Sequence, residues 1–425
     1  MHVAILTAGG AGMFCGSCMH DNTWARAMID QGVEVSLLPA YTPVRLDEPN
    51  LSRPRVFLGG INMYLSARSR IWRAMPRFMT RLLDQPWLIN LSTKWAVSND
   101  ARELGELTLA MLAGADGPER RAVDELVHFL TRELRPDVIV FSNALMVGAL
   151  KTLRQDFRGK IFCVLQGDDI FLEDLVEPYH SQAIAMMRER VQEFDGIIVH
   201  SRYYRGFMAE YLAIPVEKFH VIPLGIDMSG HTGTPGPRAS DRFTVGYFAR
   251  ICPEKGLHLL MDAFEVLHAR QPRTKLRVGG YLGPRDQTYF EKLSPRAKSW
   301  GDAFEHVGSP ATHAGKVEFL SSLDVLSVPT TYREPKGLYV LEALANGTPV
   351  VQPRHGSFPE LIEQTHGGIL VDPNNSQALA NALEEMLLKN DERLHFAREG
   401  YDLVRQHYGL EEMARRSIEI FASNS

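Results

Sequence analysis

Short apolar stretches alternate with amphipathic stretches along most of the chain. Residues 3–6 are uniformly apolar and predict a buried strand, residues 21–30 carry apolar side chains at helical spacing and predict a helix, and residues 33–38 predict a second strand. The same order recurs after residue 243. Strands that alternate with helices are typical of doubly wound α/β domains with parallel sheets.

One such unit carries polar groups at its turn. Residues 324–329 predict a strand that ends on a proline, residues 330–336 form a polar loop, and a helix is expected from Gly337. The helix ends at Asn346-Gly347, because this pair favours the left-handed conformation that terminates helices. This βαβ unit contains the strongest functional signal in the sequence.

Two glutamates flank the entry of this helix. Glu334 precedes it and Glu342 lies inside it, with seven residues between them. The free N–H groups and the helix dipole favour an anion near Gly337, Leu338 and Tyr339. Carboxylates accept hydrogen bonds from sugar hydroxyls. The arrangement therefore predicts a site for a nucleotide sugar, with its diphosphate on the helix end.

A pair of cations follows the strand expected at residues 245–251. Arg250 and Lys255-Gly256 come just before the next helix, where an arginine fork and a lysine point charge would bind a diphosphate. The alternative is an ordinary surface pair in a loop.

These motifs carry a family resemblance. The spacing of Glu334 and Glu342, the phrase GLYVLEALANGTPVV at 337–351, and Gly356 with Pro359-Glu360 resemble the signature of the family 4 retaining glycosyltransferases, or glycosyl transferases group 1. The resemblance implies an α/β protein of the GT-B fold, with two Rossmann-like, doubly wound parallel-sheet domains facing across a cleft. The alternative is a generic doubly wound element with two solvated glutamates.

The resemblance also implies a domain organisation. Residues 1–228 would form the acceptor domain and residues 243–408 the donor domain, and a helix within 409–425 would cross back to the first domain. Residues 229–242 are rich in glycine, proline and serine, and this composition predicts a flexible linker.

The implied reaction is transfer of a sugar from a nucleoside diphosphate sugar to an acceptor hydroxyl, with retention at the anomeric carbon. Glu334, Arg250 and Lys255 are the expected catalytic residues, with Glu334 on the donor sugar and Glu342 on the ribose. The leaving phosphate oxygen is the expected base. The full donor-binding set implied by the resemblance is Gly16, Gln166, Arg250, Lys255, Val307, Glu334, Lys336, Gly337, Leu338, Tyr339 and Glu342.

Gln166 departs from the family pattern. Family members commonly carry histidine at this place, whereas glutamine can form hydrogen bonds but cannot shuttle a proton. The expected acceptor contacts are His20, Asp21 and Asp168, although Asp168 and its neighbour Asp169 are also suited to capping the helix that follows.

Composition excludes several classes of protein. The chain has 425 residues, of which 45% are hydrophobic and 23% charged, and a formal charge of −5, so that two domains are expected and nucleic acid is not an expected partner. The absence of a signal peptide or a run of 18 apolar residues predicts a cytoplasmic protein. Four cysteines fit a reducing compartment. We expect neither a metal nor a bound cofactor, because Cys15 and Cys18 form a single CxxC without a second ligand pair.

Residues 62–94 form a basic segment with interleaved aromatic side chains. Such a segment can contact an anionic membrane surface at the inner face of the membrane or bind an acidic acceptor, and alternatively it is an insertion with its arginines in water. The basic residues are Arg68, Arg70, Arg73, Arg77, Arg81 and Lys94.

Other functions stay open at this point. A GT-B relative that only binds a nucleotide sugar, or that epimerises it, fits Gln166 as well as a transferase does. A phosphorylase with pyridoxal phosphate and a redox protein built on Cys15 and Cys18 are more remote alternatives. The sequence leaves open the base, the sugar, the acceptor, the linkage and the oligomeric state.

Overall fold

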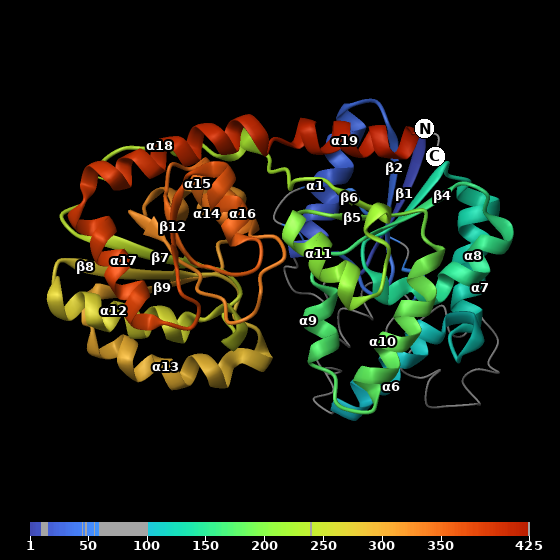
Figure 1. Ribbon diagram of the computed structural model, residues 1–425, viewed down its shortest axis with the longest axis horizontal. Coiled ribbons are helices and arrows are strands. Elements are labelled where there is room, and N and C mark those ends of the chain that lie inside the picture. Colours follow the sequence, from blue (N-terminus) through green and yellow to red (C-terminus); the bar gives the residue numbers. More distant parts are fainter. Residues whose placement is uncertain are drawn as a thin grey trace. The chain divides into compact units, whose positions relative to one another are not determined.

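The computed structural model describes residues 1–9, 16–44, 46, 49–54, 56–58, 101–238 and 240–423. Cys15 and the segment 62–94 lie outside the described residues, and the predictions about them stay predictions. The chain divides into two compact units (Figure 1). The first comprises Met1–Pro223 and Met413–Ser425, and the second comprises Leu224–Glu412.

The first unit is built on a six-stranded sheet of order β2-β1-β3-β4-β5-β6, in which all pairs are parallel. Strand β1 lies between β2 and β3, so the chain reverses its direction of travel across the sheet at this point. Apolar side chains such as Val3, Ile5 and Ile139 are fully buried in it. The strands are β1 His2–Thr7, β2 Glu34–Pro39, β3 Val138–Phe141, β4 Lys160–Val164, β5 Gly196–Val199 and β6 Phe219–Val221.

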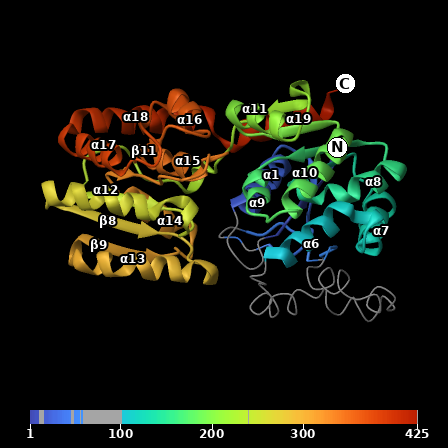
Figure 2. The same cartoon turned by 60° about the horizontal axis from the view of Figure 1, so that its bottom comes forward.

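Helices cover this sheet, and one of them comes from the end of the chain. Helix α19 (Leu410–Ala422) crosses α1 in Figure 1 and lies near it again in Figure 2, and the Trp24 indole N–H donates to Ser417 Oγ at 2.9 Å. The other helices of the unit are α1 Gly16–Asp30, α6 Ala101–Ala113, α7 Arg120–His128, α8 Leu150–Asp156, α9 Asp168–Glu173, α10 Tyr179–Arg190 and α11 Arg202–Tyr211, with a 3₁₀ helix η4 at Ala144–Ala149.

The second unit has its own six-stranded parallel sheet, of order β12-β11-β10-β7-β8-β9. Strands β7 to β9 run outward on one side and β10 to β12 on the other, so β7 and β10 are neighbours at the point where the strand order reverses. The strands are β7 Phe243–Phe248, β8 Thr274–Gly279, β9 Phe304–Gly308, β10 Val325–Leu326, β11 Val350–Pro353 and β12 Gly368–Val371.

Helices α12 and α13 lie on one face of this second sheet and α14 to α16 on the other (Figure 1), as right-handed crossovers in opposite directions require. The prediction of doubly wound α/β architecture is confirmed for both units. The arrangement of two domains across a cleft stays a prediction. The helices are α12 Leu257–Arg270, α13 Gln287–Ser299, α14 His313–Ser321, α15 Leu338–Ala345, α16 Phe358–Thr365, α17 Ser376–Leu388 and α18 Asn390–His407, with a 3₁₀ helix η8 at Pro253–Lys255.

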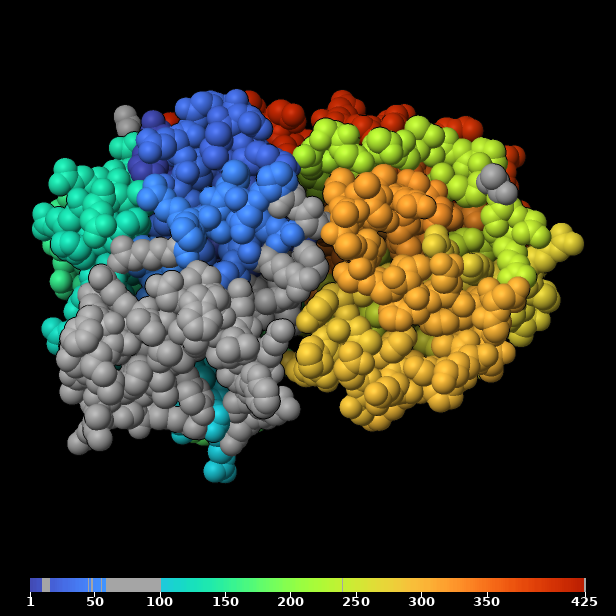
Figure 3. Space-filling view, turned by 180° about the vertical axis from the view of Figure 1, so that it is seen from behind, coloured from blue at the N-terminus to red at the C-terminus, as the bar shows by residue number. Residues whose placement is uncertain are grey.

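Two local predictions differ from the structure. The first helix begins at Gly16 and not at Asp21. Its first turns bury the polar residues His20, Asp21 and Asn22, so the buried face has no apolar pattern there by which the helix could be predicted. The stretch 229–242, expected to be a linker, lies on the surface of the second unit, in light green in Figure 3. Its Arg238 donates to the carbonyl of Leu323 at 3.0 Å and therefore ties the stretch to that unit.

Among the helices that the structure describes, none combines the length and the apolar character needed to cross a lipid bilayer.

Candidate functional site

The candidate site of the second unit lies at the reversal of its strand order. The loop after β7 carries Lys255, and the loop after β10 carries Glu334. Because β7 and β10 are parallel neighbours, both loops leave the sheet at the same edge, which is where open α/β sheets bind ligands. The Lys255 Nζ donates to Glu334 Oε2 at 2.7 Å.

Gly256 allows the two loops to approach each other. Its φ is +71°, and a Cβ at this position would lie 1.9 Å from the carbonyl oxygen of Pro329. The Thr331 N–H donates to the carbonyl of Glu254 at 2.9 Å, which fixes the same contact from the other side. The glycine of the Lys-Gly pair therefore sets the distance between Lys255 and the β10 loop.

Gly356 supports Glu334 in the same way. This glycine has φ +60°, and a Cβ would lie 2.5 Å from the backbone oxygen of Glu334. The Ser357 N–H donates to that oxygen at 2.8 Å. Gly356, the first residue of the motif with Pro359 and Glu360, thus packs directly against the backbone of Glu334.

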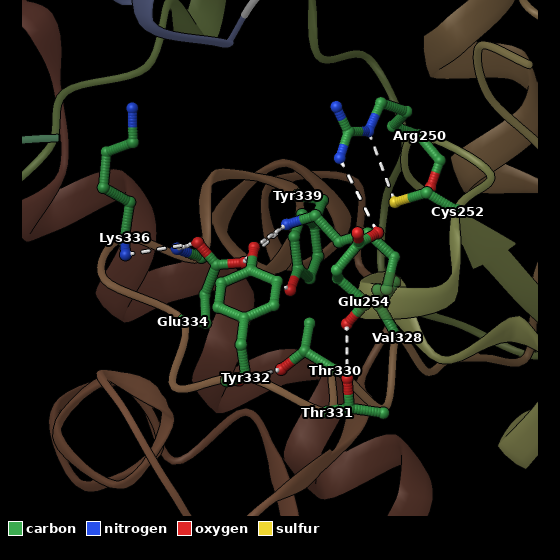
Figure 4. A network of polar contacts seen from close by, with 12 residues as sticks. Arg250, Cys252, Glu254, Val328, Thr330, Thr331, Tyr332, Glu334, Lys336 and Tyr339 are labelled. Atoms are coloured by element: carbon green, nitrogen blue, oxygen red, sulfur yellow. Dashed lines mark hydrogen bonds and ion pairs between the residues drawn. The ribbon is translucent and has the colours of Figure 1, made fainter. Parts of the chain in front are cut away.

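Several donors converge on the Glu334 carboxylate, as Figure 4 shows. Besides Lys255, the Tyr332 hydroxyl donates to Oε2 at 2.9 Å and the Tyr339 hydroxyl at 3.1 Å. The N–H groups of Lys336 and Gly337 lie 3.4 Å from Oε1. Glu334 therefore occupies part of the helix entry at which an anion was expected.

The carboxylate of Glu334 is ionised in this setting although only 4% of the residue is exposed. Burial by itself would raise its pKa, but the charge of Lys255 and the hydrogen bonds from Lys255 and Tyr332 outweigh burial and lower the pKa to about 2. The site thus contains a buried, ionised carboxylate that is paired with a half-buried lysine.

Arg250 lies beside this pair and reaches into solvent. Its side chain is 44% exposed, its Nε donates to Cys252 Sγ at 3.3 Å, and its guanidinium lies 3.8 Å from Glu254 (Figure 4). The buried thiol, whose pKa is raised by burial, is a neutral neighbour. Arg250 therefore has donors at the edge of the site, as a contact to phosphate requires.

Helix α15 carries the second glutamate. Gly337 caps it with φ +74°, and Leu338 and Tyr339 form its first turn. Glu342 lies within the helix, and its Oε1 accepts a hydrogen bond from Lys316 Nζ at 2.8 Å. Both side chains of this pair are at most 10% exposed. The residue expected on the ribose therefore already has a cationic partner in α14, which the sequence analysis missed.

Val307 lies on β9, which is separated from β7 by β8 in the sheet. It is half-buried in β9, and β9 pairs with β8 and not with β7 or β10. Its neighbour Glu305 is paired with Lys275 and Arg277, at 2.6 and 3.1 Å. A contact of Val307 with a nucleotide base stays a prediction.

A second polar cluster lies at the carboxyl edge of the first sheet. Gln166 follows β4, and its Nε2 donates to Asp21 Oδ1 at 3.0 Å and to the carbonyl of Ser142 at 3.2 Å. Asp21 also accepts from the Thr7 hydroxyl at 2.6 Å, and His20 Nδ1 lies 3.3 Å from it. The structure thus brings together Gln166, His20 and Asp21, three of the residues predicted in the first unit.

Asp168 is close in sequence to this cluster but has structural contacts. It is 1% exposed, and its two oxygens accept from the N–H groups of Ala144 at 2.7 Å and Gln166 at 2.9 Å. Burial raises its pKa to about 6. The contact with Ala144 holds the first N–H of η4, and the contact with Gln166 holds that residue's backbone. Asp168 therefore stabilises the two loops and does not face solvent.

Gly16 is the first residue of α1 and is exposed, with no heavy atom within 4 Å of an added Cβ. Cys18 is buried in the same helix. Within the described part of the chain, no three His, Cys, Asp or Glu side chains are placed to hold a metal ion.

The sequence analysis did not identify three side chains that belong to the candidate site of the second unit: Tyr332, Lys316 and Cys252. Tyr332 is two residues from Glu334, and this proximity was a usable signal. Lys316 stands in a largely apolar helix and is 6% exposed, and a lysine in such a position is ordinarily read as a surface residue. Cys252 follows Arg250 in the chain, but nothing in its spacing indicates a hydrogen bond.

Comparisons with known proteins agree with this geometry. Residues 235–403 match the family model described as glycosyl transferases group 1. The chain is 31% identical over 219 residues to a GDP-mannose-dependent alpha-(1-6)-phosphatidylinositol monomannoside mannosyltransferase of Mycolicibacterium smegmatis, and the match covers 47% of this chain and 55% of that one. The chain spans about half the length of the curated relatives it matches.

Solved structures show the fold. A sucrose-phosphate synthase of Thermosynechococcus elongatus has a TM-score of 0.70 at 18% identity, and the match covers 99% of this chain and 98% of that one. Anabaena Alr3699/HepE in complex with UDP-glucose has a TM-score of 0.68 at 18% identity, and each chain is covered completely. The chain has the GT-B fold.

Proposed function

We propose that this chain, whose residues 235–403 match the glycosyl transferases group 1 family, transfers a sugar from a nucleoside diphosphate sugar to an acceptor hydroxyl. The observation that carries the proposal is the pair of Lys255 and Glu334 at the reversal of the strand order. Arg250, which would bind phosphate, and the N-terminus of α15 lie beside this pair, and Glu334 itself provides a carboxylate for sugar hydroxyls.

The charges of the site favour cleavage of a bond to a diphosphate. When the bond between the anomeric carbon and the diphosphate breaks, negative charge develops on the leaving phosphate oxygen. Arg250, Lys255 and the N–H groups at the start of α15 provide positive charge at fixed positions for it. We propose that this charge replaces a metal ion, and that the leaving oxygen accepts the acceptor's proton, with retention at the anomeric carbon.

Each glutamate has a separate role in this proposal. Glu334 accepts hydrogen bonds from the donor sugar, and Glu342, held by Lys316, accepts them from the ribose. The first unit supplies the acceptor side through His20 and Asp21, and Gln166, which donates to Asp21, contacts the donor. The acceptor itself stays open.

The test is binding, followed by product analysis. At least one of UDP, GDP and ADP, at one hundred times its dissociation constant, should stabilise the protein by about 2.7 kcal/mol, with or without magnesium. Lys255→Ala should abolish the thermal shift, whereas Lys298→Ala, an exposed lysine of α13, should keep it. Stabilisation by none of the three nucleotides would refute the proposed donor site.

A second function is supported by Gln166, because its amide already donates to Asp21 and Ser142 and carries no titrating proton. A protein that binds the nucleotide sugar without transfer, or epimerises it, would show the same nucleotide stabilisation. Mass analysis after incubation with UDP-glucose or GDP-mannose identifies transfer or hydrolysis, because either releases the nucleotide. An epimer and an unchanged donor have the same mass, and NMR of the recovered sugar separates an epimerase from a binder.

A further inference from the structure

Three donors meet at a single oxygen of Glu334. Lys255, Tyr332 and Tyr339 all donate to Oε2, at 2.7, 2.9 and 3.1 Å, whereas from the part of the chain that the structure describes Oε1 accepts from the two backbone N–H groups at 3.4 Å (Figure 4). Lys255 also contacts the Tyr332 hydroxyl directly, and its Nζ lies 5.0 and 5.1 Å from the centroids of the two tyrosine rings. The two phenols thus surround both members of the ion pair.

Lys255 has a second partner in the proposed reaction, and the inference rests on that proposed function. As negative charge develops on the leaving diphosphate, the ammonium is attracted to phosphate as well as to Glu334. A buried carboxylate that loses part of its counter-charge takes up a proton unless other donors hold it. Besides Lys255, the only donors to Glu334 among the described residues with bonds shorter than 3.4 Å are the two tyrosine hydroxyls.

We propose that Tyr332 and Tyr339 are positioning residues, whose hydroxyls keep Glu334 ionised and correctly oriented while Lys255 is engaged by the diphosphate. Their hydrogen bonds fix Oε2, which directs Oε1 towards the start of α15, where the donor sugar would meet it. The Lys255 Nζ contacts the Tyr332 hydroxyl and lies about as far from the Tyr339 ring centroid as from that of Tyr332, so that both tyrosines also limit the positions open to the ammonium.

Both phenols are suited to this task. Burial, together with the charge of Glu334, raises their pKa values well above the ordinary one, so they keep their protons and act as donors at every working pH. A phenylalanine at either position retains the ring and removes only the donor. The titratable or charged groups that face Glu334 or its two phenols are Tyr247, Arg250, Cys252, Lys255, Lys336 and His355.

The experiment compares Tyr332→Phe, Tyr339→Phe and the double variant with wild type. The control is Tyr401→Phe, a tyrosine of α18 whose ring contacts Arg405. Turnover of UDP-glucose, GDP-mannose or ADP-glucose, chosen by the nucleotide that stabilises the wild type, is measured as nucleotide release from pH 4.5 to 8.5. Water serves as the acceptor, so that its oxygen bonds to the anomeric carbon as the diphosphate leaves.

Each single variant should lower kcat by about tenfold, with KM within about twofold of wild type. The reason is that the lost hydrogen bond holds the charged Glu334 carboxylate, which needs it most when negative charge develops on the leaving diphosphate and attracts Lys255. The double variant should gain an acidic limb in its pH profile above pH 5, which wild type lacks. Tyr401→Phe should match wild type. Wild-type kcat and pH profile in the double variant, or a rise in KM alone, would overturn the inference.

A second measurement requires no turnover. In a double-mutant cycle with Glu334→Gln, the fall in Tm caused by Tyr332→Phe should shrink, because the phenol acts on the charged carboxylate. Additive shifts would overturn the inference even in an active enzyme. A wild type that binds no nucleotide would instead refute the proposed function, and the two failures are therefore distinguishable.

Discussion

Replacing Lys255 by methionine should destabilise the second unit in a manner that depends on pH. The Glu334 carboxylate has a pKa of about 2 in the folded chain and close to 4.3 when unfolded. That difference of roughly two units corresponds to about 3 kcal/mol of stability at pH 7. The methionine removes the charge that outweighs burial, so the pKa of Glu334 rises and this contribution is lost.

The sign of the pH dependence follows from the depressed pKa. A carboxyl group with a lowered folded pKa stabilises the protein above its unfolded pKa, and this stability is lost as the pH falls from about 4.5 to about 2. The difference between wild type and Lys255→Met should therefore be full at pH 7 and narrow towards pH 3. For a unit of this size, 3 kcal/mol corresponds to a fall in Tm of roughly 6–12 °C.

Scanning calorimetry at pH 7 and pH 3 measures this difference, with Lys298→Met as the matched control on an exposed lysine. The double variant Lys255→Met/Glu334→Gln should recover much of the lost Tm, because no uncompensated charge remains buried. A Tm loss that is the same at both pH values, without recovery in the double variant, would refute the assignment of a buried ion pair.

Three further predictions concern other parts of the fold. Gly256→Ala should lower the Tm of the second unit and abolish stabilisation by nucleotide, because a Cβ would lie 1.9 Å from the Pro329 oxygen; unchanged binding would contradict the close approach. Asp168 has a raised pKa of about 6, so the folded chain binds the extra proton and stability should fall as the pH rises from 4 to 6; Asp168→Asn should remove this slope in urea titrations. Ser417→Ala should cost about 1–3 kcal/mol in the first unit, because the buried Trp24 N–H loses its acceptor, and an unchanged Tm would count against that bond.

Much of the fold follows from the period of apolar residues alone. The strand predicted at residues 3–6 lies within β1 (His2–Thr7), because a uniformly apolar run can be buried on both faces of a sheet. Strand β10 is shorter than predicted, with two residues in place of the six at 324–329. Beyond Leu326 the Ser327 N–H still donates to the Gly246 carbonyl at 2.9 Å, but Pro329 has no N–H for the ladder.

The site was predictable in part. The glycines, the two glutamates and the cations were visible as motifs, since each has a local spacing that chemistry explains. The pairing of Lys255 with Glu334, 79 residues apart, required the strand order and could not be read from either segment. The partner of Glu342 was hidden for another reason: a lysine buried in an ion pair looks in sequence like a surface residue.

Helix α19 has a consequence for the order of events in synthesis. The core of the first unit includes Trp24 and Phe162, both in contact with Phe421 of this helix. A ribosome makes the whole second unit before it makes residues 413–423. The first unit is therefore incomplete, with the aromatic surface of Trp24 and Phe162 not yet covered by Phe421, while the ribosome synthesises the roughly 190 residues of the second unit. Protection of that surface by a chaperone during translation would be of direct benefit to this chain.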